Sequence, residues 1–300
     1  MKYGVNVDSI LKTLNTRLVN KEKETYNLED ALLFIKQVGF DCVDFGFGDF
    51  ASDMPEVEFY SRIKEIKKYL DSIGLTVSQT HGRVGYFKAP STEWLIERAK
   101  KEIKATALLG CKYAVIHPLR TPLSNYDGDT ENRKAQNLKF YNSLKPVLQE
   151  CGVVLCIENL FADDEERKIS CPNTCSRPEE ILYYLDNLGT ENFAVCFDVG
   201  HMLLTADLTG DTVCGAMIKL GKHIKVLHVH DNRKTKDDHY APFMGVMDWK
   251  EFASTLKKIG YDGVMSFEIV PYRALPKPTI HSLTCYYKYI RAVGDIEKML

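Results

Sequence analysis

Apolar, strand-like runs alternate with amphipathic helical patterns along the whole chain, and this alternation limits the available folds more than any other feature. We count eight such units, with strands that start near Tyr3, Cys42, Leu75, Lys112, Val153, Phe193, Lys225 and Gly263. Strand–helix alternation implies parallel strands joined by right-handed crossovers. Over 300 residues, the pattern predicts one (β/α)8 barrel domain, a TIM barrel that spans residues 1–300.

An open, doubly wound sheet is the alternative fold for such a pattern. That fold usually carries a glycine-rich phosphate loop after its first strand. Here the first strand is followed by Asn6, Val7, Asp8 and Ser9 instead. We therefore favour the barrel.

Helix boundaries can be placed from capping residues and glycines. We expect a first helix that begins after Asn27, a capping box over Ser176–Glu179, and a helix capped by Asp248. Glycines follow most helical patterns, where a left-handed residue ends a helix at low cost. They are Gly39, Gly74, Gly110, Gly152, Gly189, Gly221 and Gly260. Helix-to-strand loops are thus short, whereas loops after the strands are long at 118–130, 159–175 and 232–247.

Composition excludes several classes of protein. The 39 basic and 41 acidic residues give no single-sign field that would attract nucleic acid or an anionic membrane. No apolar run is long enough to span a bilayer, and the N-terminal residues lack the apolar stretch of a secretion signal. Nine cysteines, an odd number, favour a reducing cytoplasm over a disulfide framework. Cys171 and Cys175 have zinc-knuckle spacing, but no second pair follows, so we expect two loop thiols.

Polar residues stand at the C-terminal end of strand after strand. Barrel strands are buried on both faces and should be nearly continuously apolar, so a charge there needs a reason. From the third strand to the eighth, the polar residues are His81, His117, Glu158 with Asn159, Asp198 with His201, His228 with His230, and Glu268. Barrel closure would bring all of them to one mouth, where enzymes of this fold carry their chemistry.

Three carboxylates that converge at this mouth would repel one another, and their pKa values would rise sharply without a cation. A divalent metal held by Glu158, Asp198, His228 and Glu268 resolves the repulsion. Carboxylates with one imidazole suit a fairly hard ion. We expect Mn²⁺, with Co²⁺, Mg²⁺ and Zn²⁺ as alternatives. His228 lies deeper than His230, which we assign to the substrate or to a supporting role.

The motifs together resemble the xylose-isomerase-like TIM-barrel superfamily. They are Cys156–Asn159, Asp198–His201, Leu227–Asn232, Asp237–His239 with Gly245, Asp248 with Trp249, and Phe267 with Glu268. The group includes sugar phosphate isomerases and epimerases, ketose 3-epimerases, inosose dehydratases and isomerases, and the zinc endonucleases called endonuclease IV. The resemblance covers essentially the whole chain.

The epimerase branch implies a role for each matching residue. Glu158, Asp198, His228 and Glu268 would hold one metal, and Glu158 and Glu268 would also act as the catalytic acid and base. The resemblance implies a substrate contact for His201, and we also expect His81, His117, His230 and Arg233 to contact substrate. Ketose 3-epimerases carry an arginine at a set distance after the strand-seven histidine, and in this chain Arg233 and Lys234 bracket that place. The implied reaction is isomerisation or epimerisation of a small sugar or polyol, by proton transfer through a metal-stabilised ene-diolate.

Other branches imply other activities. Endonuclease IV binds three zinc ions through nine ligands, and this chain matches them all, at His81, His117, Glu158, Asp198, His201, His228, Asp237, His239 and Glu268. Asp237 and His239 are therefore candidate ligands of an additional metal, although we expect one tight ion and a solvated Asp237–His239 pair. A lyase that dehydrates a cyclitol or opens a C-glycoside, and a non-catalytic sugar-binding barrel, are further alternatives. The substrate, its phosphorylation and any homo-oligomer stay open.

Overall fold

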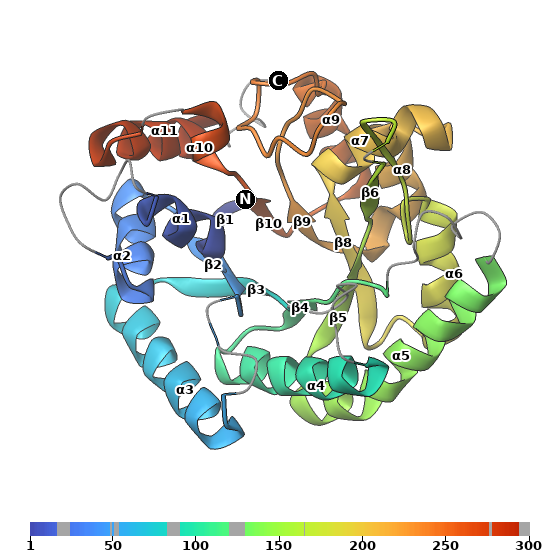
Figure 1. Cartoon of the computed structure of the whole chain (residues 1–300), viewed down its shortest axis with the longest axis horizontal. Coiled ribbons are helices and arrows are strands. Elements are labelled where there is room, and N and C mark those ends of the chain that lie inside the picture. Colours follow the sequence, from blue (N-terminus) through green and yellow to red (C-terminus); the bar gives the residue numbers. More distant parts are fainter. Residues whose placement is uncertain are drawn as a thin grey trace.

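Eight parallel strands form the central sheet of the protein (Figure 1). The computed structural model describes residues 1–16, 25–48, 50, 54–82, 91–119, 130–164, 166–275 and 278–293. The strands are β1 (Lys2–Asn6), β2 (Cys42–Gly46), β3 (Thr76–His81), β4 (Tyr113–Val115), β5 (Val154–Glu158), β8 (Phe193–Asp198), β9 (Ile224–His228) and β10 (Val264–Phe267). All eight predicted strands are confirmed.

The sheet closes on itself into a barrel. Its order is β10-β1-β2-β3-β4-β5-β8-β9, and each neighbouring pair is parallel. Between β9 and β10, the Val229 amide donates to the Ser266 carbonyl at 2.8 Å, and the Glu268 amide donates to the Val229 carbonyl at 3.2 Å. The predicted TIM barrel is confirmed.

Helices surround the strands as an outer ring (Figure 1). They are α1 (Val7–Leu14), α2 (Leu28–Val38), α3 (Glu56–Ile73), α4 (Thr92–Leu108), α5 (Thr130–Cys151), α6 (Pro178–Leu188), α7 (Val199–Thr209), α8 (Val213–Leu220), α9 (Trp249–Ile259), α10 (Pro271–Ala274) and α11 (Ile280–Val293), with a 3-10 turn at Gly221–His223. Among the described residues, no helix is long and apolar enough to cross a membrane.

Two apolar layers hold the barrel together. The larger layer lies between strands and helices and is rich in aromatic residues, such as Phe45, Phe59 and Tyr287, which are almost completely buried. The smaller layer fills the barrel interior below the mouth, with Val115, Cys156, Ala194, Cys196 and Val226. Since this packing lies below the strand ends, polar substitutions at the mouth should leave most of it intact.

Most predicted helix boundaries are confirmed. Asn27 forms a capping box with Asp30, and Asp248 accepts a hydrogen bond from the Glu251 amide. Gly74 and Gly260 end their helices with φ of 63° and 68°, the left-handed conformation that favours glycine.

The predicted capping box at Ser176–Glu179 is wrong. Helix α6 starts one residue later, with Arg177 at the N-cap position and Pro178 in the first turn, and it has no side-chain cap. The Glu179 carboxylate binds Lys219 instead, while Glu180 accepts the Cys175 amide. Proline fixes the backbone angle of the first turn, so the helix can start there without a capping side chain.

Two elements were absent from the sequence interpretation. Helix α1 follows β1 directly, with Asn6 as its N-cap, ahead of the expected first helix. The expected loop at 159–175 contains an antiparallel hairpin of β6 (Phe161–Asp164) and β7 (Ile169–Pro172). The hairpin packs beside α7, and its Phe161 ring contacts the His201 ring, with centroids 4.9 Å apart. Most of the loop at 118–130 lies outside the described residues.

Candidate metal centre

Each of the eight strands delivers a polar side chain to the same end of the barrel. In spatial order from β1 to β10, these are Asn6, Asp44, His81, His117, Glu158, Asp198, His228 and Glu268. The predicted convergence of the last six is confirmed by the fold. Asn6 and Asp44 were missed. Asn6 ends the first strand, whereas Asp44 stands in the middle of β2, between Val43 and Phe45, and so does not show the strand-end pattern.

The predicted ligands Glu158, Asp198, His228 and Glu268 come together as one group. One ligand atom from each lies within 4.8 Å of those from the others. The Nδ1 atom of His228 lies 3.1 Å from Glu158 Oε1, 3.4 Å from Glu268 Oε2 and 3.7 Å from Asp198 Oδ2. Glu158, Asp198 and His228 are at most 1% exposed, whereas the Glu268 side chain is 18% exposed. A cation among them would thus have ligands from four strands and one accessible carboxylate.

A second group shares Glu158. His117 Nε2 lies 2.8 Å and His81 Nε2 lies 3.4 Å from the Glu158 Oε2 atom. The two imidazole Nε2 atoms are 3.1 Å apart. Both histidines were expected to contact substrate, and they do reach the mouth, but their nitrogens point at a carboxylate of the candidate centre. This arrangement also suits ligands of a second cation.

A third group lies beside the first and is built largely from loops. It contains His201, His230, Asp237 and His239. The His230 and His239 rings are stacked with centroids 4.0 Å apart, and His239 Nε2 lies 2.6 Å from Asp237 Oδ2. His230 Nε2 also lies 3.1 Å from Asp198 Oδ1, which connects this group to the first.

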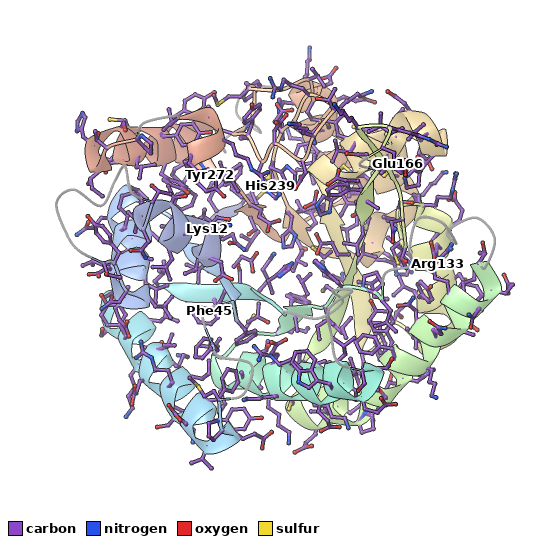
Figure 2. All side chains as sticks on the ribbon, viewed as in Figure 1. Lys12, Phe45, Arg133, Glu166, His239 and Tyr272 are labelled. Carbon is purple, nitrogen blue, oxygen red and sulfur yellow. The ribbon has the colours of Figure 1, made fainter. Side chains whose placement is uncertain are left out.

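The expected solvated position of Asp237 and His239 is wrong. His239 is 9% exposed, and its Nδ1 atom contacts the Glu268 carbonyl oxygen at 2.6 Å. Figure 2 shows His239 nearer the barrel axis than the labelled Glu166 and Arg133. The loop folds inward because the buried Asp231 carboxylate accepts hydrogen bonds from the Gly245 and Met247 amides and from the Trp249 indole.

Close packing at Gly200 makes room for the third group. A Cβ atom at Gly200 would lie 1.9 Å from Cε1 of His230. On the same turn, the Asp198 carboxylate accepts the His201 amide at 2.6 Å and so caps α7. Asn159 fixes the backbone of Asp198 through two hydrogen bonds of 2.8 and 2.9 Å. The motif Asp198–Val199–Gly200–His201 therefore positions two groups at once.

Histidines neutralise the buried carboxylates, contrary to the expectation of raised carboxyl pKa values. Burial alone would raise the pKa of Glu158, but His228 and His117 outweigh it and hold the pKa well below its usual range. Asp198 behaves alike: burial opposes ionisation, but His201 and His230 lower the pKa. Repulsion alone therefore does not require a cation.

The same contacts raise the pKa values of two histidines. Burial by itself would lower the pKa of His81 and of His239. The neighbouring carboxylates, Glu158 and Asp237, instead raise both pKa values to about 9. In the metal-free protein these imidazoles bind protons near neutral pH, in positions where a metal ion would bind instead.

Arg233 lies apart from the three groups. Its side chain is 58% exposed, donates to the Asp238 carboxylate at 3.2 Å, and lies over the Tyr240 ring. It lines a cavity of about 910 Å³ between the β6–β7 hairpin and the 232–247 loop, which also reaches Asp237. A second cavity of about 800 Å³ reaches His81 from the α1 side. The contact of Arg233 with substrate stays a prediction.

The fold and the mouth define a TIM barrel with a cluster of residues at its strand ends that could hold a metal ion. The chain belongs to the xylose isomerase-like TIM barrel family, whose family model matches residues 32–289. This confirms the resemblance expected from the motifs.

Individual relatives are distant. The chain is 26% identical over 181 residues to an inosose isomerase of Bacillus licheniformis, which covers 58% of this chain and 60% of that protein. It is also 26% identical over 192 residues to a probable endonuclease 4 of Mycoplasmopsis agalactiae, which covers 61% of this chain and 63% of that protein. The chain spans between 42% and 63% of the length of the curated relatives that it matches.

Solved structures share the whole fold. The IolI protein, crystallised with a bound zinc atom, superposes with a TM-score of 0.72 at 18% identity and covers 100% of this chain and 99% of its own. This likeness supports the same barrel architecture.

Proposed function

We propose that the chain is a divalent-metal-dependent isomerase or epimerase that acts on a small sugar or polyol. The observation that carries the proposal is that Glu158 and Glu268, from the ends of strands β5 and β10, both approach His228 Nδ1, at 3.1 and 3.4 Å. The similarity to an inosose isomerase supports the same class of reaction. The metal identity, with Mn²⁺ as the expected ion, is part of the proposal.

The residues fit a divalent cation. Four ligand atoms converge within 4.8 Å, and the buried Glu158 Oε2 atom faces two further imidazole nitrogens, at 2.8 and 3.4 Å. When bound, the cation would hold neighbouring substrate oxygens and stabilise negative charge on them. Three of the four ligands are carboxylates, which favours a hard ion, although the nearby histidines also suit Zn²⁺.

The two glutamates differ in their freedom to move protons. Glu158 is contacted by His81, His117 and His228 and is almost inaccessible, so its carboxylate is held in a fixed position. Glu268 faces the mouth with 18% of its side chain exposed. We therefore assign to Glu268 the removal of a proton from the carbon beside the carbonyl, and to Glu158 the return of a proton from the other side. Such general acid–base groups contribute roughly 10²–10⁴-fold each.

Solvent exchange tests the proposal. The chain, loaded with Mn²⁺, is incubated in D₂O with a panel of ketoses, phosphorylated sugars and cyclitols, and deuterium is located by NMR. We expect label at the carbon next to the carbonyl, and its loss in Glu268→Gln. Two results together would contradict the mechanism: turnover of a substrate without uptake of solvent deuterium, and a Glu268→Gln variant that still binds metal and stays active.

A second candidate is a hydrolytic function with several metal ions. One observation favours it: two further histidine groups lie next to the first group. The His81–His117 pair shares Glu158 with it, and the group that contains His239 contacts its Asp198 through His230. Metal clusters of this kind stabilise in-line displacement at phosphorus. Three zinc ions per chain, together with cleavage of DNA at abasic sites, would establish this candidate over the first.

A further inference from the structure

Asp44 places a carboxylate inside the barrel, where no role has yet been assigned to it. It lies on β2 and is completely buried. Burial of a charged carboxylate is costly unless partners compensate for the lost water. The Asn6 amide donates to Asp44 Oδ2 at 3.2 Å, while the Oδ1 atom has no hydrogen-bond partner among the described residues. A purely structural role explains such a residue poorly, because an apolar side chain would fill the position at lower cost.

The other neighbour of Asp44 is a candidate metal ligand. His228 Nε2 has no hydrogen bond within the described part of the chain, and Asp44 Oδ2, at 3.3 Å, is an acceptor within reach of its proton; both side chains are completely buried. On the opposite side of the same ring, Nδ1 faces Glu158 and Glu268 at 3.1 and 3.4 Å. The imidazole therefore stands between two acidic environments, with one nitrogen in each.

The geometry points to Asp44 as the residue that orients His228. We propose that Asp44 accepts the Nε2 proton of His228, so that Nδ1 is unprotonated and directed at the cation. This role rests on the proposed metal centre. A neutral imidazole has one protonated nitrogen, and the partner of that nitrogen decides which one is left to bind metal. Asp44 is thus a positioning residue. It does not act as a ligand, because it contacts the ring on the side away from the other ligands.

Asn6 holds Asp44 in place and connects it to the start of α1. Asn6 and Asp44 are direct partners in the register of β1 and β2. The Asn6 side chain uses both ends: its Nδ2 donates to Asp44, and its Oδ1 accepts the Ser9 amide at 2.9 Å as the N-cap of α1. With Asn6 held in this way, the Asp44 carboxylate has little freedom to rotate, which favours a fixed orientation of His228.

Metal affinity tests the role directly. Zn²⁺ dissociation constants are measured by chelator competition for the intact chain and for Asp44→Asn, Asp44→Leu and Ser266→Ala. Asp44→Asn retains an acceptor without the charge, and Asp44→Leu removes both. We expect losses of roughly 10-fold for Asp44→Asn and 100-fold for Asp44→Leu, the range found for partners of metal-binding histidines. Ser266 is equally buried in the barrel and its hydroxyl has no partner within the described residues, so Ser266→Ala should leave the constant unchanged.

A second measurement needs no substitution. In ¹⁵N NMR spectra of the metal-free chain at a pH where His228 is neutral, the proton should reside on Nε2. Co²⁺ absorption spectra of Asp44→Asn should also shift relative to the intact chain, which a loss of stability alone would not cause.

The outcomes separate this inference from the proposed function. An intact chain that binds no Zn²⁺ would remove the metal centre itself. If the intact chain binds Zn²⁺, two results would overturn only the role of Asp44. One is a folded Asp44→Leu variant with the same affinity for Zn²⁺ as the intact chain, and the other is a His228 proton on Nδ1.

Discussion

The barrel mouth carries two kinds of candidate metal-binding group that differ in what holds them. The Glu158–Asp198–His228–Glu268 group comes from the ends of four strands, whose positions are fixed by the barrel. The His201–His230–Asp237–His239 group takes two of its members from the 232–247 loop, which is held by the buried Asp231. Strand-borne groups are therefore set by the fold, whereas loop-borne groups depend on a few local hydrogen bonds.

The largest effect should come from the strand-borne group. Glu158→Gln removes a carboxylate that faces both His228 and the His81–His117 pair. We expect loss of bound metal and an activity loss that exceeds the roughly 10²–10⁴-fold of a single acid–base group. Elemental analysis and circular dichroism check this outcome, because the packing below the mouth should keep the barrel folded. Full activity in metal-free protein would refute the assignment.

Gly200→Ala should disturb the loop-borne group selectively. The new Cβ would overlap the His230 ring, so the ring or the start of α7 must move. We expect a loss of about 1–3 kcal/mol in unfolding free energy, as for overpacked cores. A tight ion at the strand-borne group should nevertheless remain. Denaturant unfolding and metal stoichiometry measure the two effects, and loss of all metal would show that the groups form one unit.

The pH dependence should reveal the protons that a metal displaces. His81 and His239 have pKa values of about 9 in the metal-free protein, so both are protonated at pH 7. A cation needs neutral imidazoles, so its binding at pH 7 should release protons, and the affinity should rise as the pH approaches 9. Calorimetry in buffers of different ionisation enthalpy counts the protons.

The same pKa values have a consequence for the stability of the metal-free fold. Both are raised above the ordinary value of 6.5, so protonation stabilises the folded state. This contribution is fully present below about pH 6.5 and is lost as the pH rises through about 9. Denaturant unfolding of metal-free protein should show a falling midpoint over that interval. A constant midpoint, with no protons released on binding, would contradict both expectations.

Arg233→Ala should have the smallest effect. The side chain is exposed and paired with Asp238, outside both groups. If it contacts substrate, KM should rise with kcat unchanged, because only binding common to substrate and transition state is lost. An unchanged KM would remove Arg233 from the site, and Arg233→Lys is the matched control for charge.

Sequence patterns were sufficient for the barrel because they repeat. Eight apolar runs, each followed by an amphipathic helix, admit few topologies, and a polar residue at the end of an apolar strand is visible without a structure. His81, His117, Glu158, Asp198, His228 and Glu268 were found in this way. Their convergence follows from strand order alone, since parallel strands deliver their C-terminal ends to one side.

Only the tertiary structure decided what surrounds these residues. The inward fold of the 232–247 loop depends on Asp231 contacts 14 to 18 residues away along the chain, which local patterns do not encode. The contact between Asp44 and His228 spans strands that are distant in sequence and meet across the barrel. The lowered pKa values of Glu158 and Asp198 likewise depend on which histidines face them. The sequence by itself determined the barrel and the identities of its strand-end groups, because both follow from short-range periodicity. The burial, orientation and charge compensation of these groups depend on the three-dimensional packing. Each is set by neighbouring residues that are distant in sequence and come together only when the barrel closes.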